Sequence, residues 1–349
     1  MVNIMKRIYY CLVILILCVK CFASIEPWTW HFKKIFSKND IQRIQKKHEI
    51  IFSKCDVPFF TQLIFSWNAF RPQQGYFIFY GQIRDAKTKQ WHNWHKMITW
   101  GKDKQHSHFN RADSGSVYSH VRLEVPSAEE ADGLRIRIVS HDGADLGLFR
   151  SISACTAHLF RFSSECFNKQ LALLPSVLIK SVPKISQMMI NHPKKDVLCS
   201  PTSCSMLVSF TLGQKIDPVA FADAVYDHGL KAYGSWPFNT AHAFELLQGH
   251  VLCYVMRLSS FTYMHGLLNT GIPVVASVRG SIEGAPKEYP SGHLLVVVGW
   301  DQKNQKVICH DPAWDSHQKT YAQYDLISFL RAWERSRRLV YVVEPICSS

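Results

Sequence analysis

The stretch Ser291-Gly-His-Leu-Leu-Val-Val-Val-Gly-Trp300 places one histidine at the start of a long apolar run. A short run of this kind, rich in β-branched residues, predicts a buried strand that begins near His293. A second apolar run, Val307-Ile-Cys-His-Asp311, follows after a short turn and ends in an aspartate. Because two such runs would pair as neighbouring strands, we expect Asp311 to reach the ring of His293 and to fix its tautomer.

A candidate nucleophile lies upstream of these strands. Cys199 immediately precedes a predicted helix over 201–212, in which Pro201 occupies the first turn and after which Gly213 follows. A thiol at a helix N-terminus is exposed to the positive end of the helix dipole, which lowers its pKa. His293 would then act as base and acid, and Gln187 would donate a hydrogen bond to an oxyanion.

Three nearby residues compete for the same roles. Cys204 lies five residues after Cys199, within the predicted helix, and we expect it to pack in the core. His192 lies in a polar loop where no strand would hold it. Asp301 is the alternative carboxylate, but its setting, Asp301-Gln-Lys-Asn304, is typical of a turn.

The C-terminal half, 180–349, alternates little between strand and helix. Helices are predicted first, over 201–212, 240–248 (with Asn239 as its N-cap) and 260–268; strands over 273–278, 293–300 and 307–310, a helix over 326–334 and a strand over 339–343 then follow. Helices followed by a sheet indicate an α+β domain rather than repeated βαβ units.

Residues 56–160 have a different pattern, because apolar and polar residues alternate with period two. Val117, Val121 and Leu123 share one face of such a segment, and turn signals separate the segments. This pattern predicts an all-β sandwich. The tryptophans of the region, which look exposed, leave packing and the binding of sugars or peptides both open; they are Trp67, Trp91, Trp94 and Trp100. We expect no metal at the clustered histidines His92, His95, His106 and His108.

Composition and charge bound the class of protein. The chain has 349 residues, is 47% hydrophobic and 19% charged, and has a formal net charge of +13. These values exclude a disordered chain and a polytopic membrane protein. Part of the positive charge lies in 24–55, which we expect to be a basic linker or helical segment; the rest is spread too evenly to predict nucleic-acid binding. A second linker is expected over 161–179.

The N-terminus has the pattern of a secretory signal. Lys6 and Arg7 precede an apolar run over 8–19, and a cleavage site follows Ala23. The run is too short to span a bilayer as a helix, so we expect residues 1–23 to be removed, no stable membrane span afterwards, and a secreted protein, either periplasmic or extracellular. Eight cysteines remain after residue 23, none in a CxxC pair of zinc spacing, so we expect no metal and no cofactor.

Several strings together resemble a known family. They are Val182-Pro-Lys-Ile-Ser-Gln187, Cys199-Ser-Pro-Thr-Ser203, Tyr233-Gly-Ser-Trp-Pro-Phe-Asn-Thr-Ala241, Gly271-Ile-Pro-Val-Val275, Ser291-Gly-His-Leu-Leu-Val296 and His310-Asp-Pro-Ala313. Over roughly 180–345, this order resembles the secreted papain-fold cysteine peptidases related to bacteriocin-leader-processing peptidases, the family 39-like branch. The match departs from the leader-processing enzymes at Ser200, where they carry Gly, and in its longer interval between Gln187 and Cys199.

The resemblance implies a papain-like α+β domain after a β-sandwich, with Cys199 as nucleophile, His293 as general base and acid, Asp311 as orienting carboxylate and Gln187 as oxyanion donor. We therefore expect an exported cysteine peptidase that hydrolyses peptide bonds in a peptide or protein through an acyl-enzyme. Two alternatives stay open: a peptide amidase or transamidase that acts on a cell-wall polymer with the same residues, and a non-catalytic binding protein that uses the sandwich.

Overall fold

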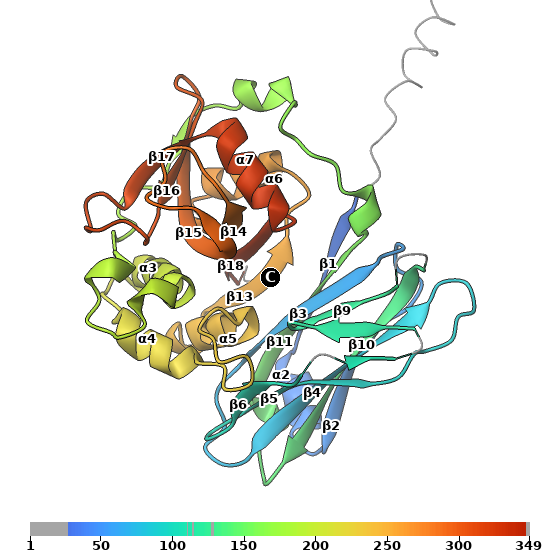
Figure 1. Cartoon of the computed structure of the whole chain (residues 1–349). Coiled ribbons are helices and arrows are strands. Elements are labelled where there is room, and N and C mark those ends of the chain that lie inside the picture. Colours follow the sequence, from blue (N-terminus) through green and yellow to red (C-terminus); the bar gives the residue numbers. More distant parts are fainter. Residues whose placement is uncertain (1–26, 110, 114, 127–128, 347–349) are drawn as a thin grey trace, which may run out of the picture.

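The computed structural model describes residues 27–109, 111–113, 115–126 and 129–346 (Figure 1). The expected signal segment, 1–23, lies outside these residues. Within the described ranges, no helix is long and apolar enough to cross a membrane.

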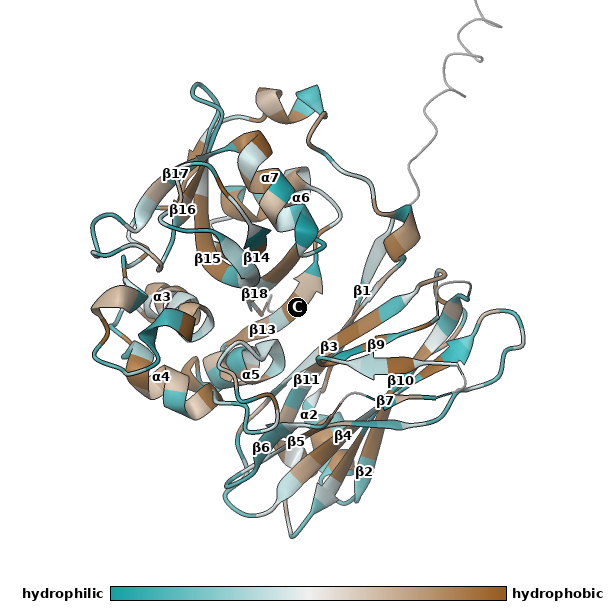
Figure 2. Cartoon of the chain, viewed as in Figure 1, coloured by the Kyte–Doolittle hydropathy of each residue, from teal (hydrophilic) through white to brown (hydrophobic). Residues whose placement is uncertain are grey.

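Two antiparallel sheets form the N-terminal part of the molecule. The first contains, in spatial order, β1 (Thr29–Ile35), β11 (Phe149–Ala157), β3 (Gln62–Ala69), β9 (Arg122–Glu124), β8 (Val117–Ser119) and β7 (Arg111–Ala112). The second contains β2 (Glu49–Lys54), β10 (Ala131–His141), β4 (Tyr76–Asp85), β5 (His95–Gly101) and β6 (Gln105–Ser107). Figure 2 shows apolar residues along the strands of both sheets, and buried apolar residues from both sheets belong to one hydrophobic cluster. The alternation in the sequence therefore produces the sandwich that it predicts.

The tryptophans of the sandwich divide into two pairs. Trp67 and Trp100 are fully buried, and Trp67 stacks on Phe79 with 4.0 Å between ring centroids. Trp91 and Trp94 are half-buried, and the guanidinium of Arg135 lies 3.8 Å from the ring centroid of Trp91. Of the two roles left open, packing therefore applies to Trp67 and Trp100, which form part of the core.

The described part of the basic segment 24–55, residues 27–55, belongs to the sandwich rather than to a linker. Its residues form β1, which pairs with β11, the helix α2 (Lys38–Ile44), and β2, which pairs with β10. In β2, Ile50 and Phe52 are buried while Ile51 and the lysine at the strand's end face outward. The many lysines of the segment hide this alternation, because they occupy solvent-facing positions and the helix.

The C-terminal part is built on a third antiparallel sheet. Its strands are, in spatial order, β13 (Val251–Arg257), β18 (Leu339–Pro345), β14 (Val274–Gly280), β15 (Tyr289–Asp301), β16 (Lys306–His310) and β17 (Tyr321–Asp325). The helices are α3 (Cys199–Leu212), α4 (Pro218–Val225), α5 (Trp236–Leu246), α6 (Phe261–Asn269) and α7 (Leu326–Arg335). The short strand β12 (Val177–Leu178) pairs with β15. The end of the expected linker 161–179 therefore joins this sheet, and 3-10 turns lie earlier in the segment.

Four of these elements were not expected from the sequence: α4, β12, β13 and β17. In addition, α5 begins at Trp236, with Ser235 at the N-cap position and Pro237 in its first turn, whereas Asn239 had been expected to cap it. Asn239 is instead buried inside the helix, and its amide nitrogen donates to the carbonyl oxygens of Tyr233 and Ser235 at 2.8 and 2.9 Å. A proline in the first turn costs no hydrogen bond, so the helix starts earlier than its polar residue suggests.

The two parts meet along the outer edge of β13, which lies beside β3 in Figure 1. Side chains of the sandwich satisfy the backbone of this edge strand. Asn68 exchanges two hydrogen bonds with the backbone of Cys253, and the hydroxyl of Ser66 accepts from the N–H of Val255 at 3.2 Å. The N–H of Arg257 donates to the sulfur of Cys155 at 3.3 Å. An exposed strand edge is thereby covered within the molecule.

Candidate active site

Cys199 is the first residue of α3, which is the central helix of the C-terminal part. It is half-buried, while α3 is buried from Ser200 through Ser209. Leu198 precedes the helix and provides no side-chain cap, in contrast to Asp217, Ser260 and Asp325, which cap α4, α6 and α7. The first N–H groups of α3 are therefore available to the sulfur and to a ligand beside it.

His293 lies on β15 and faces this thiol. The hydroxyl of Ser203 donates to the carbonyl oxygen of Leu294 at 3.0 Å and so joins α3 to β15 next to both residues. His293 and the backbone N–H groups of Leu294 and Ser200 lie next to the sulfur of Cys199 and stabilise its thiolate. The long apolar strand predicted from the sequence thus brings His293 and Cys199 together across the sheet.

The pKa values of this pair favour its charged form. Burial raises the pKa of the Cys199 thiol, but the hydrogen bond and charge of His293 and the two N–H donors outweigh burial, so the pKa is lowered from its ordinary value. Burial lowers the pKa of His293, whereas Asp311 and the hydrogen bond with Cys199 raise it, to about 9 overall. A thiolate beside an imidazolium is the reactive form of a nucleophilic cysteine.

Asp311 follows β16 directly and is completely buried. Its Oδ1 lies 2.7 Å from Nε2 of His293 and also accepts from the N–H of Ala313 at 2.9 Å. Burial raises the pKa of Asp311, but His293 and the hydroxyl donors lower it by more. The pKa is therefore below its ordinary value. Since Nε2 is engaged with the aspartate, Nδ1 is the ring nitrogen left for the thiol.

Two tyrosines complete the site, and neither was expected there from the sequence. The hydroxyls of Tyr289 and Tyr324 each donate to Oδ2 of Asp311 at 2.7 Å. The ring of Tyr289 also stacks on His293, with 4.1 Å between centroids and 11° between planes. Tyr289 lies four residues before His293 on the same strand, so the period-two rule places both on one face and was a usable signal. Tyr324 lies on β17, which was not predicted.

Gln187 is buried behind the segment that leads into Cys199. Its Nε2 donates to the carbonyl oxygen of Lys195 at 2.9 Å. Its backbone N–H donates to the carbonyl oxygen of Pro312, also at 2.9 Å. It therefore ties the segment before the thiol to the segment after Asp311. Its role as an oxyanion donor stays a prediction, since one amide hydrogen is engaged with Lys195.

The competing residues lie in other surroundings. Asp301 accepts from the backbone and side chain of Asn304, in the turn that was expected. His192 accepts from the N–H of Lys194 at 3.0 Å in its loop. Cys204 is buried, and burial raises its pKa well above the ordinary value. These contacts leave His293 as the histidine beside Cys199 and Asp311 as the carboxylate that is bonded to His293.

A cleft of about 880 Å³ opens over Cys199 and His293. Its walls include 230–236, before and at the start of α5, and 287–294, which lead into and form β15. The sandwich contributes to the same cleft through Gln62 and residues 120–122. A second hollow, of about 690 Å³, lies on the sandwich between α2 and β2 and contains none of the predicted site residues.

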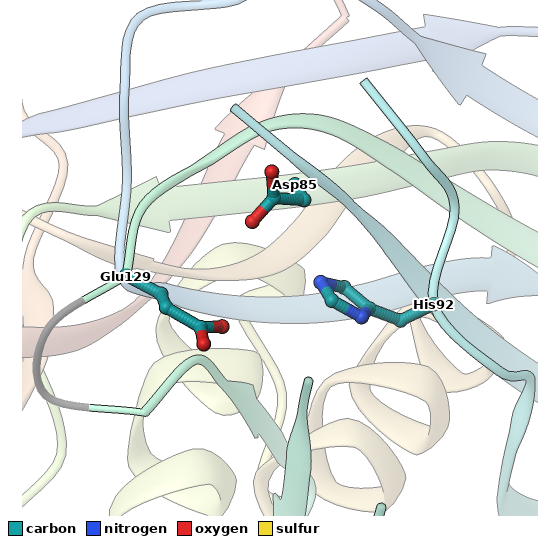
Figure 3. A group of neighbouring side chains, drawn as sticks. All are labelled: Asp85, His92 and Glu129. Carbon is teal, nitrogen blue, oxygen red and sulfur yellow. The ribbon is translucent and has the colours of Figure 1, made fainter. Parts of the chain in front are cut away.

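The described residues also hold one group of metal-ligand type, on the sandwich (Figure 3). Ligand atoms of Asp85, His92 and Glu129 lie within 4.8 Å of one another, and all three residues are half-buried. Asp85 already accepts from the backbone N–H groups of Lys87 and Thr88 and so caps a turn. The group is remote from Cys199 and gives no support for a metal in the chemistry of the cleft.

The seven described cysteines are all free thiols; they are Cys55, Cys155, Cys166, Cys199, Cys204, Cys253 and Cys309. Cys347 lies outside the described residues.

Comparison with known families matches residues 179–341 to the Peptidase_C39 like family, a segment that contains Gln187, Cys199, His293 and Asp311. A solved structure described as a C39-like peptidase from Bacillus anthracis is 18% identical, covers 49% of this chain and 98% of its own, and has a TM-score of 0.37. Xylellain, a cysteine protease from Xylella fastidiosa, is 12% identical, with 53% and 91% coverage and a TM-score of 0.33. No curated protein matches the sequence.

Proposed function

We propose that residues 179–341, which match the Peptidase_C39 like family, form a cysteine peptidase domain that hydrolyses peptide bonds through Cys199, His293 and Asp311. The observation that carries the proposal is that Cys199 and His293 line one cleft, where His293 lowers the pKa of the thiol and Asp311 holds the histidine ring through a 2.7 Å hydrogen bond. These residues come from three elements, α3, β15 and the end of β16, and the buried aspartate holds the histidine ring in one orientation.

The proposed reaction begins with the thiolate of Cys199, which attacks the carbonyl carbon of the scissile amide. The N–H groups at the uncapped start of α3 stabilise the resulting oxyanion, with Gln187 as the further predicted donor. The imidazolium of His293 donates its proton to the amine, which leaves as the carbon–nitrogen bond breaks. A thioester to Cys199 remains.

Water completes the cycle. His293, now neutral, accepts a proton from a water molecule as its oxygen attacks the thioester carbon. The carbon–sulfur bond then breaks, and the carboxylic acid and the thiolate–imidazolium pair are regenerated. Asp311 stabilises the imidazolium in both half-reactions and keeps its own charge.

The test is cleavage of a pool of short peptides of mixed sequence, followed by mass spectrometry. We expect products from the wild-type chain and a loss of at least about 10³-fold for Cys199→Ala and for His293→Ala. Cys55→Ala, which removes an exposed thiol of the sandwich, is the matched control and should retain full activity. Cleavage by Cys199→Ala at the wild-type rate, or no products from the wild type, would contradict the proposal.

We also propose that the enzyme acts after export, because 1–23 has the composition of a secretory signal. N-terminal sequencing of the protein recovered from the producing cell should then begin at Ser24. A mature chain that still starts at Met1 would overturn this part of the account.

A further inference from the structure

The cleft over Cys199 is strongly basic. Seven cationic side chains line it: Arg122, Lys231, Arg257, Arg279, Lys287, Arg335 and Arg337. Three carboxylates line it, those of Glu124, Asp196 and Glu288. A cleft with charge of one sign focuses the field and concentrates ligands of the opposite sign.

Most of these cations lack a carboxylate partner. In the described part of the chain, Arg122 alone among the seven has a carboxylate within 4 Å, that of Glu124 at 3.4 Å. Arg279, Arg335 and Arg337 are exposed, and Arg335 donates only to the carbonyl oxygen of Arg279, at 3.4 Å. The guanidinium of Arg337 also lies 4.9 Å from the ring centroid of Phe162. No carboxylate among the described residues pairs with these three arginines, so their charges can interact with an anionic ligand.

Three of the arginines meet where the sandwich faces the peptidase domain. Arg257, on β13, is buried and donates to the carbonyl oxygens of Ser336 and Arg337 at 2.8 and 2.9 Å, so it holds the turn that carries Arg337. The pKa of Arg257 is lowered to about 10 overall: burial is the main cause, and the charges of Arg122 and Arg337 act in the same direction. Like charges held this close repel one another, and a bound anion would relieve the repulsion.

Both turns that meet here have an unusual backbone. His120 and Val121, which join β8 to β9, have φ values of 48° and 56°, and Arg337 and Arg338 have 52° and 51°. A left-handed conformation is costly for a β-branched residue such as Val121. Val121 is nevertheless buried in the wall of the cleft. Strained backbone of this kind is concentrated at binding sites, where surrounding contacts hold it.

We propose that the cleft binds an acidic peptide, and that Arg122 of the sandwich and Arg337 of the peptidase domain together receive one of its carboxylates. The inference rests on the proposed function for its ligand class, because a peptide must lie along this cleft to reach Cys199. The sandwich is then part of the substrate site: its β8–β9 turn forms one wall, and its Arg122 contributes to specificity. Arg279 and Arg335 extend the basic surface along the cleft.

Binding can be measured apart from catalysis with the Cys199→Ala chain. The probes are two dye-labelled pools of short peptides that are identical except that every Asp and Glu of one is Asn or Gln in the other. We expect the acidic pool to bind about tenfold more tightly or better, with an affinity that falls as salt is added. Equal affinity for the two pools would overturn the proposal.

Substitutions locate the effect. Arg122→Gln combined with Arg337→Gln should remove most of the preference for the acidic pool, and Arg279→Gln with Arg335→Gln, at exposed positions, should reduce it. Lys215→Gln removes one exposed positive charge outside the cleft and should leave the preference unchanged. An unchanged preference in both double variants, with folding verified by circular dichroism, would contradict the assigned site.

Two further outcomes separate the hypotheses. If a single-stranded oligonucleotide of equal charge displaces the acidic pool as effectively as the unlabelled pool does, the cleft recognises anions in general and the peptide assignment is wrong. If the acidic pool binds selectively but wild-type enzyme cuts neither pool, the binding inference stands and the proposed hydrolysis fails.

Discussion

Asp311 accepts four hydrogen bonds inside the protein. Its Oδ1 interacts with His293 and the N–H of Ala313, and its Oδ2 with the hydroxyls of Tyr289 and Tyr324. A buried carboxylate with this many donors remains ionised, because each bond stabilises the charged form. The negative charge in turn raises the pKa of His293. The reactivity of the thiol therefore depends on groups that never touch it.

The pH dependence of kcat/KM tests this dependence. Activity should rise with pH through the lowered pKa of Cys199 and fall near pH 9, where His293 loses its proton. Asp311→Asn removes the charge that raises the histidine pKa, so the falling limb should move down, toward the ordinary value of about 6.5. Asp301→Asn, at the exposed turn, is the control. A falling limb that stays in place in Asp311→Asn would contradict the account.

Tyr324→Phe tests the second donor to the aspartate. Loss of the hydroxyl leaves a buried carboxylate oxygen with one donor fewer, which should cost about 1–3 kcal/mol of unfolding free energy. The carboxylate also becomes more basic, so the falling limb of the pH profile should move to higher pH. Chemical denaturation and kcat/KM measured against pH provide the two readouts.

Tyr263→Phe removes an exposed hydroxyl and serves as the control for the tyrosine variant. A structural role alone would lower the stability of Tyr324→Phe without moving its pH profile, and that result would argue against a positioning role for Tyr324.

At the scale of elements, β13 depends on side chains of another sheet. Its partner on one side is β18, and on the other side the side chains of Ser66, Asn68 and Cys155 take the place of a strand. They engage the backbone at alternate residues of β13, which is the spacing at which N–H groups of a strand point to one side.

Asn68→Ala should therefore lower the free energy of unfolding strongly, although it removes only one side-chain amide. It leaves the N–H and the carbonyl oxygen of Cys253 without partners in a buried interface, at a cost of about 2–4 kcal/mol. Urea denaturation of the full chain would measure the change, and Asn304→Ala, in an exposed turn, is the matched control. A loss below about 0.5 kcal/mol would show that the pair contributes little to the interface.

Elements were predictable from the sequence where their pattern is local. The strand that begins near His293 and the helix after Cys199 follow from apolar runs and a first-turn proline. The strands β1 and β2 were missed because they are short and lie in a segment rich in basic residues: β1 contains the adjacent Lys33 and Lys34, and β2 ends at Lys54. The start of α5 was misplaced because Asn239, a typical capping residue, bonds to backbone carbonyls from inside the helix.

At the scale of the whole molecule, one continuous apolar core extends from the sandwich into the C-terminal part. Polar contacts reinforce it: the guanidinium of Arg257 binds Gln62, and the hydroxyl and N–H of Ser107 bind the carboxylate of Asp227. An interface this apolar and this well satisfied couples the stability of its two sides.

We therefore expect the sandwich and the peptidase domain to unfold together. Urea denaturation followed by far-ultraviolet circular dichroism and by tryptophan fluorescence should give one coincident transition. Two separate transitions would show that the domains are independent, and the shared cleft would then lack a fixed geometry.

The candidate site was predictable only in part, because some of its residues come together only through contacts between distant elements. Cys199, His293 and Asp311 each stand at the end or start of a local pattern, so their roles could be inferred before the fold was known. The contribution of Arg122 to the cleft depends on how the two parts of the molecule pack. This packing cannot be predicted from the spacing of residues within one segment. The tyrosines at Asp311 likewise meet only when β15 and β17 join the same sheet.

The most direct test of the central claim is the alkylation rate of Cys199 by iodoacetamide against pH, measured peptide by peptide with mass spectrometry. Exposed Cys55 supplies a reference thiol in the same chain. A thiolate–imidazolium pair predicts rapid alkylation of Cys199 below pH 7 that is lost in His293→Ala. An ordinary profile, half-maximal near pH 8.5 in both proteins, would contradict the account.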